Sequence, residues 1–315
     1  MEKLRIVFMG TPDFAVGILD TIYNSNYEIV GVITAPDKPA GRGQKVSISA
    51  VKEYALSKKL HLLQPTNLKS PDFLLELEGL QANLQVVVAF RMLPEVVWKM
   101  PNLGTFNLHA SLLPEYRGAA PINWAIINGE TQTGVTTFFI DDKIDTGAMI
   151  LRKEIPIGAD ETAGELHDRL MLLGSEAVIE TLALIENQKA VTTIQVENPD
   201  VKTAYKLNKN NCKIDWTQPG STIKNLIRGL SPYPAAWTII KDGDQEWHVK
   251  LYAVMFESNS ESKAVGSIYT TKKEIVIVTN DGLLKVSQLQ FPGKKKMLAH
   301  ELLNGHSFSE NAIAL

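Results

Sequence analysis

Leu84-Gln85-Val86-Val87-Val88-Ala89-Phe90 is a short and almost unbroken apolar run. Such runs are typical of strands that are covered on both faces, because a strand with one wet face alternates apolar and polar residues. Two similar runs precede it, at Leu4–Met9 and Tyr27–Thr34. The segments between the runs space their apolar residues as helices do: Pro12–Asn24, Val46–Lys59 and Pro71–Glu78. This alternation predicts an α/β fold with a mostly parallel, Rossmann-like sheet.

The same alternation continues beyond residue 100. Strands are expected at Gly104–His109, Val135–Ile140 and Ala148–Ile155, and helices at Ala119–Ile127 and Thr162–Glu186. Only a short acidic loop separates the second and third of these strands, so we expect the two to pair antiparallel. These elements extend the predicted sheet.

The pattern of predicted elements changes after a polar stretch at residues 190–206. Short strand candidates then follow at close spacing: Trp237–Ile240, Trp247–Ala253, Glu274–Thr279 and Leu283–Gln288. Asn280-Asp281-Gly282 separates the last two and is a hairpin signal. Closely spaced short strands indicate a small barrel or sandwich. We therefore predict a first domain at residues 1–189, a linker at 190–206 and a second domain at 207–315.

The composition is that of an ordinary globular protein. Hydrophobic residues make up 44% of the 315 residues and charged residues 21%. No apolar run approaches the roughly 20 residues that span a bilayer, and the first residues show no signal peptide. Cys212 is the sole cysteine, which excludes an intrachain disulfide and suits a reducing compartment. We expect a cytoplasmic protein with no membrane partner.

The net charge of −3 is distributed unevenly along the chain. The first 206 residues are net negative, whereas residues 207–315 are net positive. A positive second half favours contact with a polyanion such as a nucleic acid. Chance scatter of solvated charges would give the same asymmetry, so the charge alone does not decide between the two.

Asn107 and His109 are the first candidates for chemistry. They stand two residues apart on a predicted strand, so their side chains point to the same face and Leu108 points to the other. Open α/β sheets bind their ligands at the carboxyl ends of strands. An amide can donate a hydrogen bond to an oxyanion, and an imidazole can donate or accept a proton. The pair suits a reaction that develops negative charge on a carbonyl oxygen.

The acidic loop Asp141–Gly147 offers a carboxylate that would set the charge and orientation of His109. The sequence has no Gly-x-Ser-x-Gly elbow, and Cys212 lies in the other half of the chain. These residues suggest amine attack on an acyl carbon without a covalent enzyme intermediate. Other interpretations stay open at this point, because Asn-x-His also occurs at ordinary strand ends and such a loop can be a solvated turn or a cation site.

Two longer stretches carry a resemblance to a known family. FNLHASLLPEYRGAAPINWAIINGE at residues 106–130 and TGVTTFFIDDKIDTGAMI at residues 133–150 closely resemble the signature of the folate-dependent formyltransferases. The resemblance implies that Asn107, His109 and Asp145 form the catalytic set. It also implies 10-formyltetrahydrofolate as the formyl donor, and no metal.

The same resemblance implies a folate site beside the catalytic set. The residues expected to border it lie in three short segments: Phe90, Arg91, Met92 and Leu93; Ser111, Leu112, Leu113 and Pro114; Asp141 and Asp142. The chain departs from the family at Phe90-Arg91, where many relatives have Tyr-Gly. Arg91 is therefore expected to alter that rim without abolishing the activity.

Three further stretches resemble the members of the family that act on initiator methionyl-tRNA: Phe8–Ala15, Pro36–Lys45 and Ile227–Trp237. This likeness implies an OB-like barrel at residues 207–315, with tRNA and folate as partners, and it implies nothing about a protein partner. The basic residues expected to contact tRNA are Lys38, Arg42, Lys45, Lys294, Lys295 and Lys296. The alternatives are a formyltransferase acting on an amino-sugar nucleotide, a formyltetrahydrofolate hydrolase, and a nucleic-acid-binding adaptor with an inactive catalytic domain.

Overall fold

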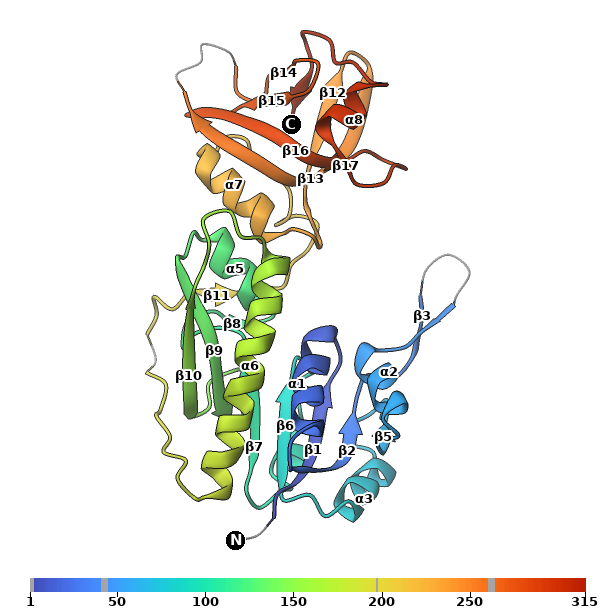
Figure 1. Ribbon diagram of the computed structural model, residues 1–315, viewed down its shortest axis with the longest axis vertical. Coiled ribbons are helices and arrows are strands. Elements are labelled where there is room, and N and C mark those ends of the chain that lie inside the picture. The colour runs from blue at the N-terminus through green and yellow to red at the C-terminus, as the bar shows by residue number, and fades with distance from the viewer. Residues whose placement is uncertain (1–2, 41–44, 197, 260–263) are drawn as a thin grey trace. The chain divides into compact units, whose positions relative to one another are not determined.

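The computed structural model describes residues 3–40, 45–196, 198–259 and 264–315, and Figure 1 labels their helices and strands. The chain divides into two compact units that are interleaved in sequence. Unit 1 contains Met1–Gly118, Thr133–Ile155 and His167–Thr203. Unit 2 contains Ala119–Gln132, Pro156–Leu166 and Ala204–Leu315. None of the described helices combines the length and the apolar character needed to cross a membrane.

Unit 1 is built on a seven-stranded sheet with the order β10-β9-β7-β6-β1-β2-β5. Its strands are β1 (Arg5–Gly10), β2 (Glu28–Ile33), β5 (Leu62–Leu63), β6 (Leu84–Val88), β7 (Thr105–His109), β9 (Gln132–Phe139) and β10 (Met149–Pro156). The five strands from β5 to β7 are parallel, and β9 runs antiparallel to β7. The mostly parallel, Rossmann-like sheet predicted from the apolar runs is therefore confirmed.

The predicted antiparallel pairing of β9 with β10 is seen in their backbone hydrogen bonds. The N–H of Phe139 donates to the carbonyl of Ala148, and the N–H of Ile157 donates to the carbonyl of Thr131. Contacts at these two ends fix opposite strand directions. From β1 the chain moves to β2 and β5 on one side and then to β6 and β7 on the other. This switch places the ligand-binding crevice of the fold outside the carboxyl ends of the central strands.

Helices cover both faces of the sheet (Figure 1). On one face lie α1 (Asp13–Tyr23) and α6 (Ala163–Glu186), which approach so closely that a Cβ at Gly17 would lie 2.5 Å from the sulfur of Met171. On the other face α3 (Pro71–Gly79) and α4 (Glu95–Trp98) join a core cluster with Val7, Met9 and Val87. Successive strand residues thus enter different cores, which explains why the runs are apolar throughout.

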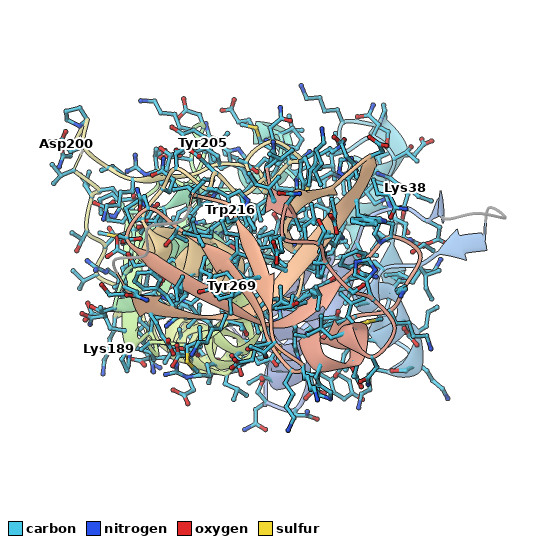
Figure 2. The ribbon with its side chains drawn as sticks, turned by 90° about the horizontal axis from the view of Figure 1, so that it is seen from above. Lys38, Lys189, Asp200, Tyr205, Trp216 and Tyr269 are labelled. Carbon is cyan, nitrogen blue, oxygen red and sulfur yellow. The ribbon has the colours of Figure 1, made fainter. Side chains whose placement is uncertain are left out.

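Two short elements of unit 1 were expected only as part of a loop or a longer helix. β3 (Lys38–Ala40) and β4 (Lys45–Ser47) form an antiparallel pair before α2 (Ala50–Ser57), and Figure 2 labels Lys38 on this pair. The hydroxyl of Ser49 caps α2 by accepting from the N–H of Lys52. At the base of the pair, Asp37 accepts hydrogen bonds from Lys52 and Gln64, which lower the pKa of Asp37.

Unit 2 contains the β-barrel, with the strand order β14-β15-β16-β13-β12-β18 and β17 paired to β16. Its strands are β12 (Ala236–Asp242), β13 (Gln245–Ser258), β14 (Ile268–Thr270), β15 (Ile275–Val278), β16 (Gly282–Gln290), β17 (Met297–Leu298) and β18 (Ile313–Ala314). The N–H of Ala314 donates to the carbonyl of Gly266, and the N–H of Ile268 donates to the carbonyl of Ala312. These bonds join the two edges, so the predicted OB-like barrel is confirmed.

Three helices complete unit 2: α5 (Pro121–Ile127), α7 (Gly220–Gly229) and α8 (Ala299–Leu303). Two minor strands, β8 (Arg117–Gly118) and β11 (Thr203–Ala204), also occur in the chain. α7 places Ile223 and Ile227 in the barrel core. Trp216, labelled in Figure 2, is buried in the same core, where its indole N–H donates to the hydroxyl of Thr238 at 2.9 Å. Burying each such side chain stabilises the unit by about 1.5–3 kcal/mol.

The closure of the barrel depends on a glycine. Gly266 has a φ of +84°, and a Cβ there would lie 2.4 Å from the carbonyl oxygen of Ala314. Gly243 has a similar φ of +59° but open space around it. A left-handed conformation costs an alanine about 1–2 kcal/mol, and the steric clash adds to this cost only at residue 266. We expect Gly266→Ala to lower the free energy of unfolding by at least about 3 kcal/mol and Gly243→Ala by about 1 kcal/mol.

Urea unfolding followed by tryptophan fluorescence measures this difference, because Trp216, Trp237 and Trp247 all lie in unit 2. Equal destabilisation by the two substitutions would show that the contact between Gly266 and β18 does not hold the barrel closed.

Candidate active site

β7 positions the two candidates that the sequence pairs. Leu108 is buried against α6, where a Cβ at Gly174 would lie 2.8 Å from its side chain. Asn107 pairs in register with Val87, which belongs to the opposite core. Asn107 and His109 therefore share the face that points away from α6, as the alternation along a strand requires. His109 is the last residue of β7, at the carboxyl edge of the sheet.

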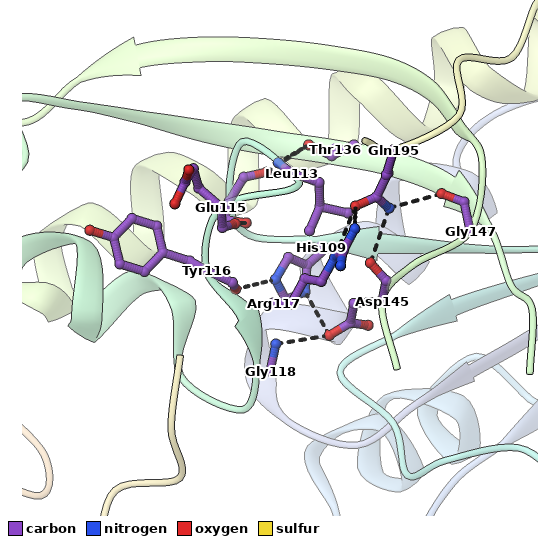
Figure 3. A network of polar contacts seen from close by, with 11 residues as sticks. His109, Leu113, Glu115, Tyr116, Arg117, Gly118, Thr136, Asp145, Gly147 and Gln195 are labelled. Atoms are coloured by element: carbon purple, nitrogen blue, oxygen red, sulfur yellow. Dashed lines mark hydrogen bonds and ion pairs between the residues drawn. The ribbon is translucent and has the colours of Figure 1, made fainter. Parts of the chain in front are cut away.

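The imidazole of His109 is buried and is held on both of its nitrogens (Figure 3). Nε2 lies 2.8 Å from the carbonyl oxygen of Tyr116. Because a carbonyl can only accept, Nε2 carries the hydrogen. Nδ1 faces the carboxylate of Asp145, with 3.8 Å between Nδ1 and Oδ2. This is ion-pair range but too long for a hydrogen bond.

The two contacts fix the orientation of the ring. The hydrogen on Nε2 is taken by the carbonyl of Tyr116, and Nδ1 faces the carboxylate of Asp145. Nδ1 makes no hydrogen bond to Asp145, so a hydrogen on Nδ1 would be able to donate to a ligand oxygen beside it.

Of the three carboxylates in the acidic loop, Asp145 is the one that forms an ion pair with His109. Its Oδ2 also accepts a hydrogen bond of 3.0 Å from the N–H of Gly118. Asp141 has a different task, because its Oδ1 accepts from the N–H of Lys143 and from the hydroxyl of Thr146 and so braces the loop. Asp142 is exposed. The structure thus separates the three candidates that the sequence leaves side by side.

Asn107 is half-buried at this edge. Within the described part of the chain, its side-chain amide makes no hydrogen bond. A half-buried amide without a protein partner is costly unless water or a ligand satisfies it. The N–H groups of Asn107 are therefore available to a bound molecule on the face that holds His109.

The segment Ser111–Pro114, one of the three expected to border the folate, alternates between fully buried and half-buried residues. Ser111 and Leu113 are fully buried, and the Ser111 hydroxyl donates to the carbonyl of Glu115 at 2.6 Å, so these two would reach a ligand only through their backbone. Leu112 and Pro114 are half-buried. This loop is tied to β9, because the N–H of Leu113 donates to the hydroxyl of Thr136.

The segment after β6 shows where Arg91 points. Its guanidinium lies 5.7 Å from the centre of the Phe90 ring and donates to the carbonyls of Pro65 and Thr66. Arg91 is thus fastened to the neighbouring loop. Met92 is exposed, whereas Leu93 belongs to the core beneath α3 and α4.

The basic residues expected to contact tRNA lie on surfaces of the two units. Lys38 is exposed on β3, Arg42 lies outside the described residues, and the side chain of Lys45 is likewise not described. Lys294, Lys295 and Lys296 form an exposed cluster between β16 and β17. The ammonium of Lys296 lies 4.7 Å from the centre of the Tyr252 ring.

Sequence reasoning missed two residues of this site. Arg117 and Gln195 lie beside Asp145 and are joined by hydrogen bonds of 2.7 and 3.1 Å. Gln195 comes from the stretch expected to be a linker. The β-branched residues of Val191–Val196 could have indicated an extended segment there. Across the described ranges, no cluster of three His, Cys, Asp or Glu side chains is arranged to hold a metal ion.

Comparisons with known proteins identify the family of the chain. The family model named Formyl transferase matches residues 4–182, and the model named Formyl transferase, C-terminal domain, matches residues 206–307. A methionyl-tRNA formyltransferase of Flavobacterium johnsoniae is 67% identical over 312 residues, covering 99% of each chain. One of Bacteroides fragilis is 50% identical over 317 residues, covering 98% of this chain and 97% of its own.

Two solved structures share the fold at lower identity. WlaRD, a sugar 3N-formyl transferase in the presence of dTDP and 5-N-formyl-THF, is 21% identical with a TM-score of 0.64, covering 94% of this chain and 100% of its own. HypX of Aquifex aeolicus in complex with tetrahydrofolic acid is 19% identical with a TM-score of 0.65, covering 96% of this chain and 47% of its own. The chain therefore belongs to the formyl transferase family, among its methionyl-tRNA formyltransferases.

Proposed function

We propose that this protein transfers the formyl group of 10-formyltetrahydrofolate to the free amino group of methionyl initiator tRNA, giving N-formylmethionyl-tRNA. One observation carries the chemistry: a buried His109 paired with Asp145 shares the carboxyl edge of the sheet with Asn107, whose amide has no hydrogen-bond partner among the described residues. The similarity to methionyl-tRNA formyltransferases supports the acceptor, and the folates present with WlaRD and HypX support the donor.

In the proposed reaction the α-amine attacks the formyl carbon and a new C–N bond forms. The carbonyl oxygen becomes an oxyanion, to which Asn107 and the Nδ1–H of His109 donate. Asp145 keeps the imidazole charged through the attack. The bond between the formyl carbon and N10 of the folate then breaks, and the proton lost by the amine goes to N10.

The folate would lie against the segments at Phe90–Leu93, Ser111–Pro114 and Asp141–Asp142. Residues 1–189 would carry the formyl chemistry and residues 207–315 the tRNA contact, joined by residues 190–206. Lys38, Arg42 and Lys45 are proposed as a further tRNA contact, because basic groups close together in the sequence suit phosphates. Because the proposed acceptor is methionyl initiator tRNA, the reaction would take place in the cytoplasm, where that tRNA is used.

One assay separates this function from its alternatives. The protein is incubated with 10-formyltetrahydrofolate and initiator methionyl-tRNA, an amino-sugar nucleotide, or no acceptor. We expect N-formylmethionyl-tRNA in the first arm and negligible turnover in the other two. A formylated sugar nucleotide would identify the sugar-nucleotide enzyme, formate released without an acceptor would identify the hydrolase, and no product in any arm would identify an inactive adaptor.

The exposed lysines between β16 and β17 are expected to contribute to tRNA binding through phosphates. Replacing Lys294, Lys295 and Lys296 together by alanine should raise the KM for charged tRNA by about tenfold. The logarithmic salt dependence of that KM should become shallower by about one to three units. The KM for the formyl donor should stay the same.

Steady-state kinetics at several salt concentrations measure both effects. The matched control is Lys272→Ala with Lys273→Ala, because both lysines are exposed on the same barrel. If the control raises the KM as much as the triple variant does, net charge and not a local contact accounts for the effect.

A further inference from the structure

Gln195 is the buried residue of an otherwise exposed segment, residues 191–196. Val191, Ile194 and Val196 are 81%, 81% and 75% exposed, whereas Gln195 is only 5% exposed. Burying an amide while leaving three aliphatic side chains in water is unfavourable unless the amide is fully hydrogen-bonded. The segment is held in this orientation by two backbone bonds of 2.8 Å between Thr193 and Met149 of β10.

The amide of Gln195 makes four hydrogen bonds (Figure 3). Nε2 donates to the carbonyls of Asp145 at 3.0 Å and Gly147 at 2.8 Å. Oε1 accepts from Nε of Arg117 at 3.1 Å and from Nη2 at 2.7 Å. A flipped amide would set its oxygen against two carbonyls and its NH2 against a guanidinium, so only one orientation is stable.

The groups that Gln195 joins are the two supports of His109. Asp145, whose carboxylate faces Nδ1, adopts a φ of +54°, in the left-handed region. That conformation is strained for a residue with a side chain, although Asp tolerates it better than most. Tyr116, whose carbonyl accepts from Nε2, directly precedes Arg117. The carboxylate of Asp145 accepts a hydrogen bond from the N–H of Gly118, which directly follows Arg117.

We propose that Gln195 is a positioning residue that fixes the carboxylate of Asp145 and the carbonyl of Tyr116 at the distances that orient the ring of His109. This inference rests on the proposed function and deepens it. Gln195 does not reach the reacting atoms itself but acts through Asp145 and Arg117. Without it, Asp145 would be free to leave its left-handed conformation, and the carboxylate would move away from Nδ1.

Two substitutions test the role. Gln195→Leu removes all four hydrogen bonds, whereas Gln195→Glu keeps an acceptor for Arg117 but turns an oxygen toward the carbonyls of Asp145 and Gly147. Both should lower kcat by about tenfold to a hundredfold, as misplaced catalytic groups do. Both should leave the KM values for donor and charged tRNA within about twofold, because no ligand contact is removed.

The matched control is Asn83→Ala. Asn83 is also 5% exposed, and its amide also bridges backbone groups, at Lys3 and Arg5, but at the amino edge of the sheet. The Asn83→Ala protein should unfold at a lower temperature than the wild-type protein and keep the wild-type kcat. If Gln195→Leu does not fold, Gln195→Glu serves alone, since its charge pairs with Arg117.

A double-mutant cycle separates positioning from mere support of the fold. In a protein that carries Asp145→Asn, the further change Gln195→Leu should lower kcat by less than about threefold. The inference would be overturned if Gln195→Leu lowered kcat by the same factor in the Asp145→Asn protein as in the wild-type protein. So would a Gln195→Leu enzyme with wild-type kcat while Asp145→Asn is impaired. A wild-type kcat in Asp145→Asn itself would instead reject the catalytic set of the proposed function.

Discussion

His109→Ala is expected to lower kcat for formylation by at least about a hundredfold. The substitution removes the imidazole that faces the site, and among the described residues it leaves the carboxylate of Asp145 with the N–H of Gly118 as its partner. Loss of a positioned acid-base group typically costs about 10²–10⁴-fold. Binding of either substrate should change little, because the pterin and the tRNA are expected to bind elsewhere along the edge.

Single-turnover formylation at saturating donor measures this effect without a contribution from product release. His61→Ala is the matched control, because His61 is exposed and its ring forms a surface ion pair with Glu76. A folded His109→Ala enzyme with near wild-type turnover would remove His109 from the mechanism.

Asn107→Ala is expected to lower kcat by about 10²–10³-fold, which corresponds to about 2.7–4 kcal/mol for one oxyanion donor. The fold should not suffer, since the amide of Asn107 has no hydrogen bond to lose within the described residues. A functional residue of this kind combines a large kinetic effect with a small effect on stability.

Thermal unfolding and single-turnover kinetics on the same preparation test that combination. Asn107→Asp gives a second measurement, because it keeps the size of the side chain but replaces the donor by a charged acceptor, and it should be at least as slow as Asn107→Ala. An Asn107→Asp enzyme that is faster than Asn107→Ala would argue against donation to an oxyanion.

Much of the fold follows from the sequence because it rests on local patterns. The central strands β1, β2 and β6 are apolar runs that only a doubly covered sheet accommodates. α7 escaped prediction although Ile223, Ile227 and Leu230 have helical spacing, because the helix has only ten residues and lies between Pro219 and Pro232. β14 and β18 are too short to carry a pattern and exist only because the barrel closes through them.

Some residues of the candidate site also follow from local sequence patterns, whereas others do not. Period-two alternation alone places Asn107 beside His109. The choice of Asp145 over Asp141 depended on the family resemblance, since the two differ only in where the loop folds. Gln195 could not be found from the sequence, because it lies 50 residues from Asp145 and reaches it only through the pairing of Thr193 with Met149.

The interleaving of the two units in the sequence affects which parts of the chain can be exchanged. Unit 2 includes α5, which the chain lays down long before the barrel, and Asn123 of α5 donates to the carbonyl of Gly229 in α7 at 2.7 Å. Ile127 packs against the barrel core. A gene rearrangement that exchanged everything after residue 206 would leave this helix facing a foreign surface. Exchange of the barrel alone would therefore remove the surface against which α5 packs.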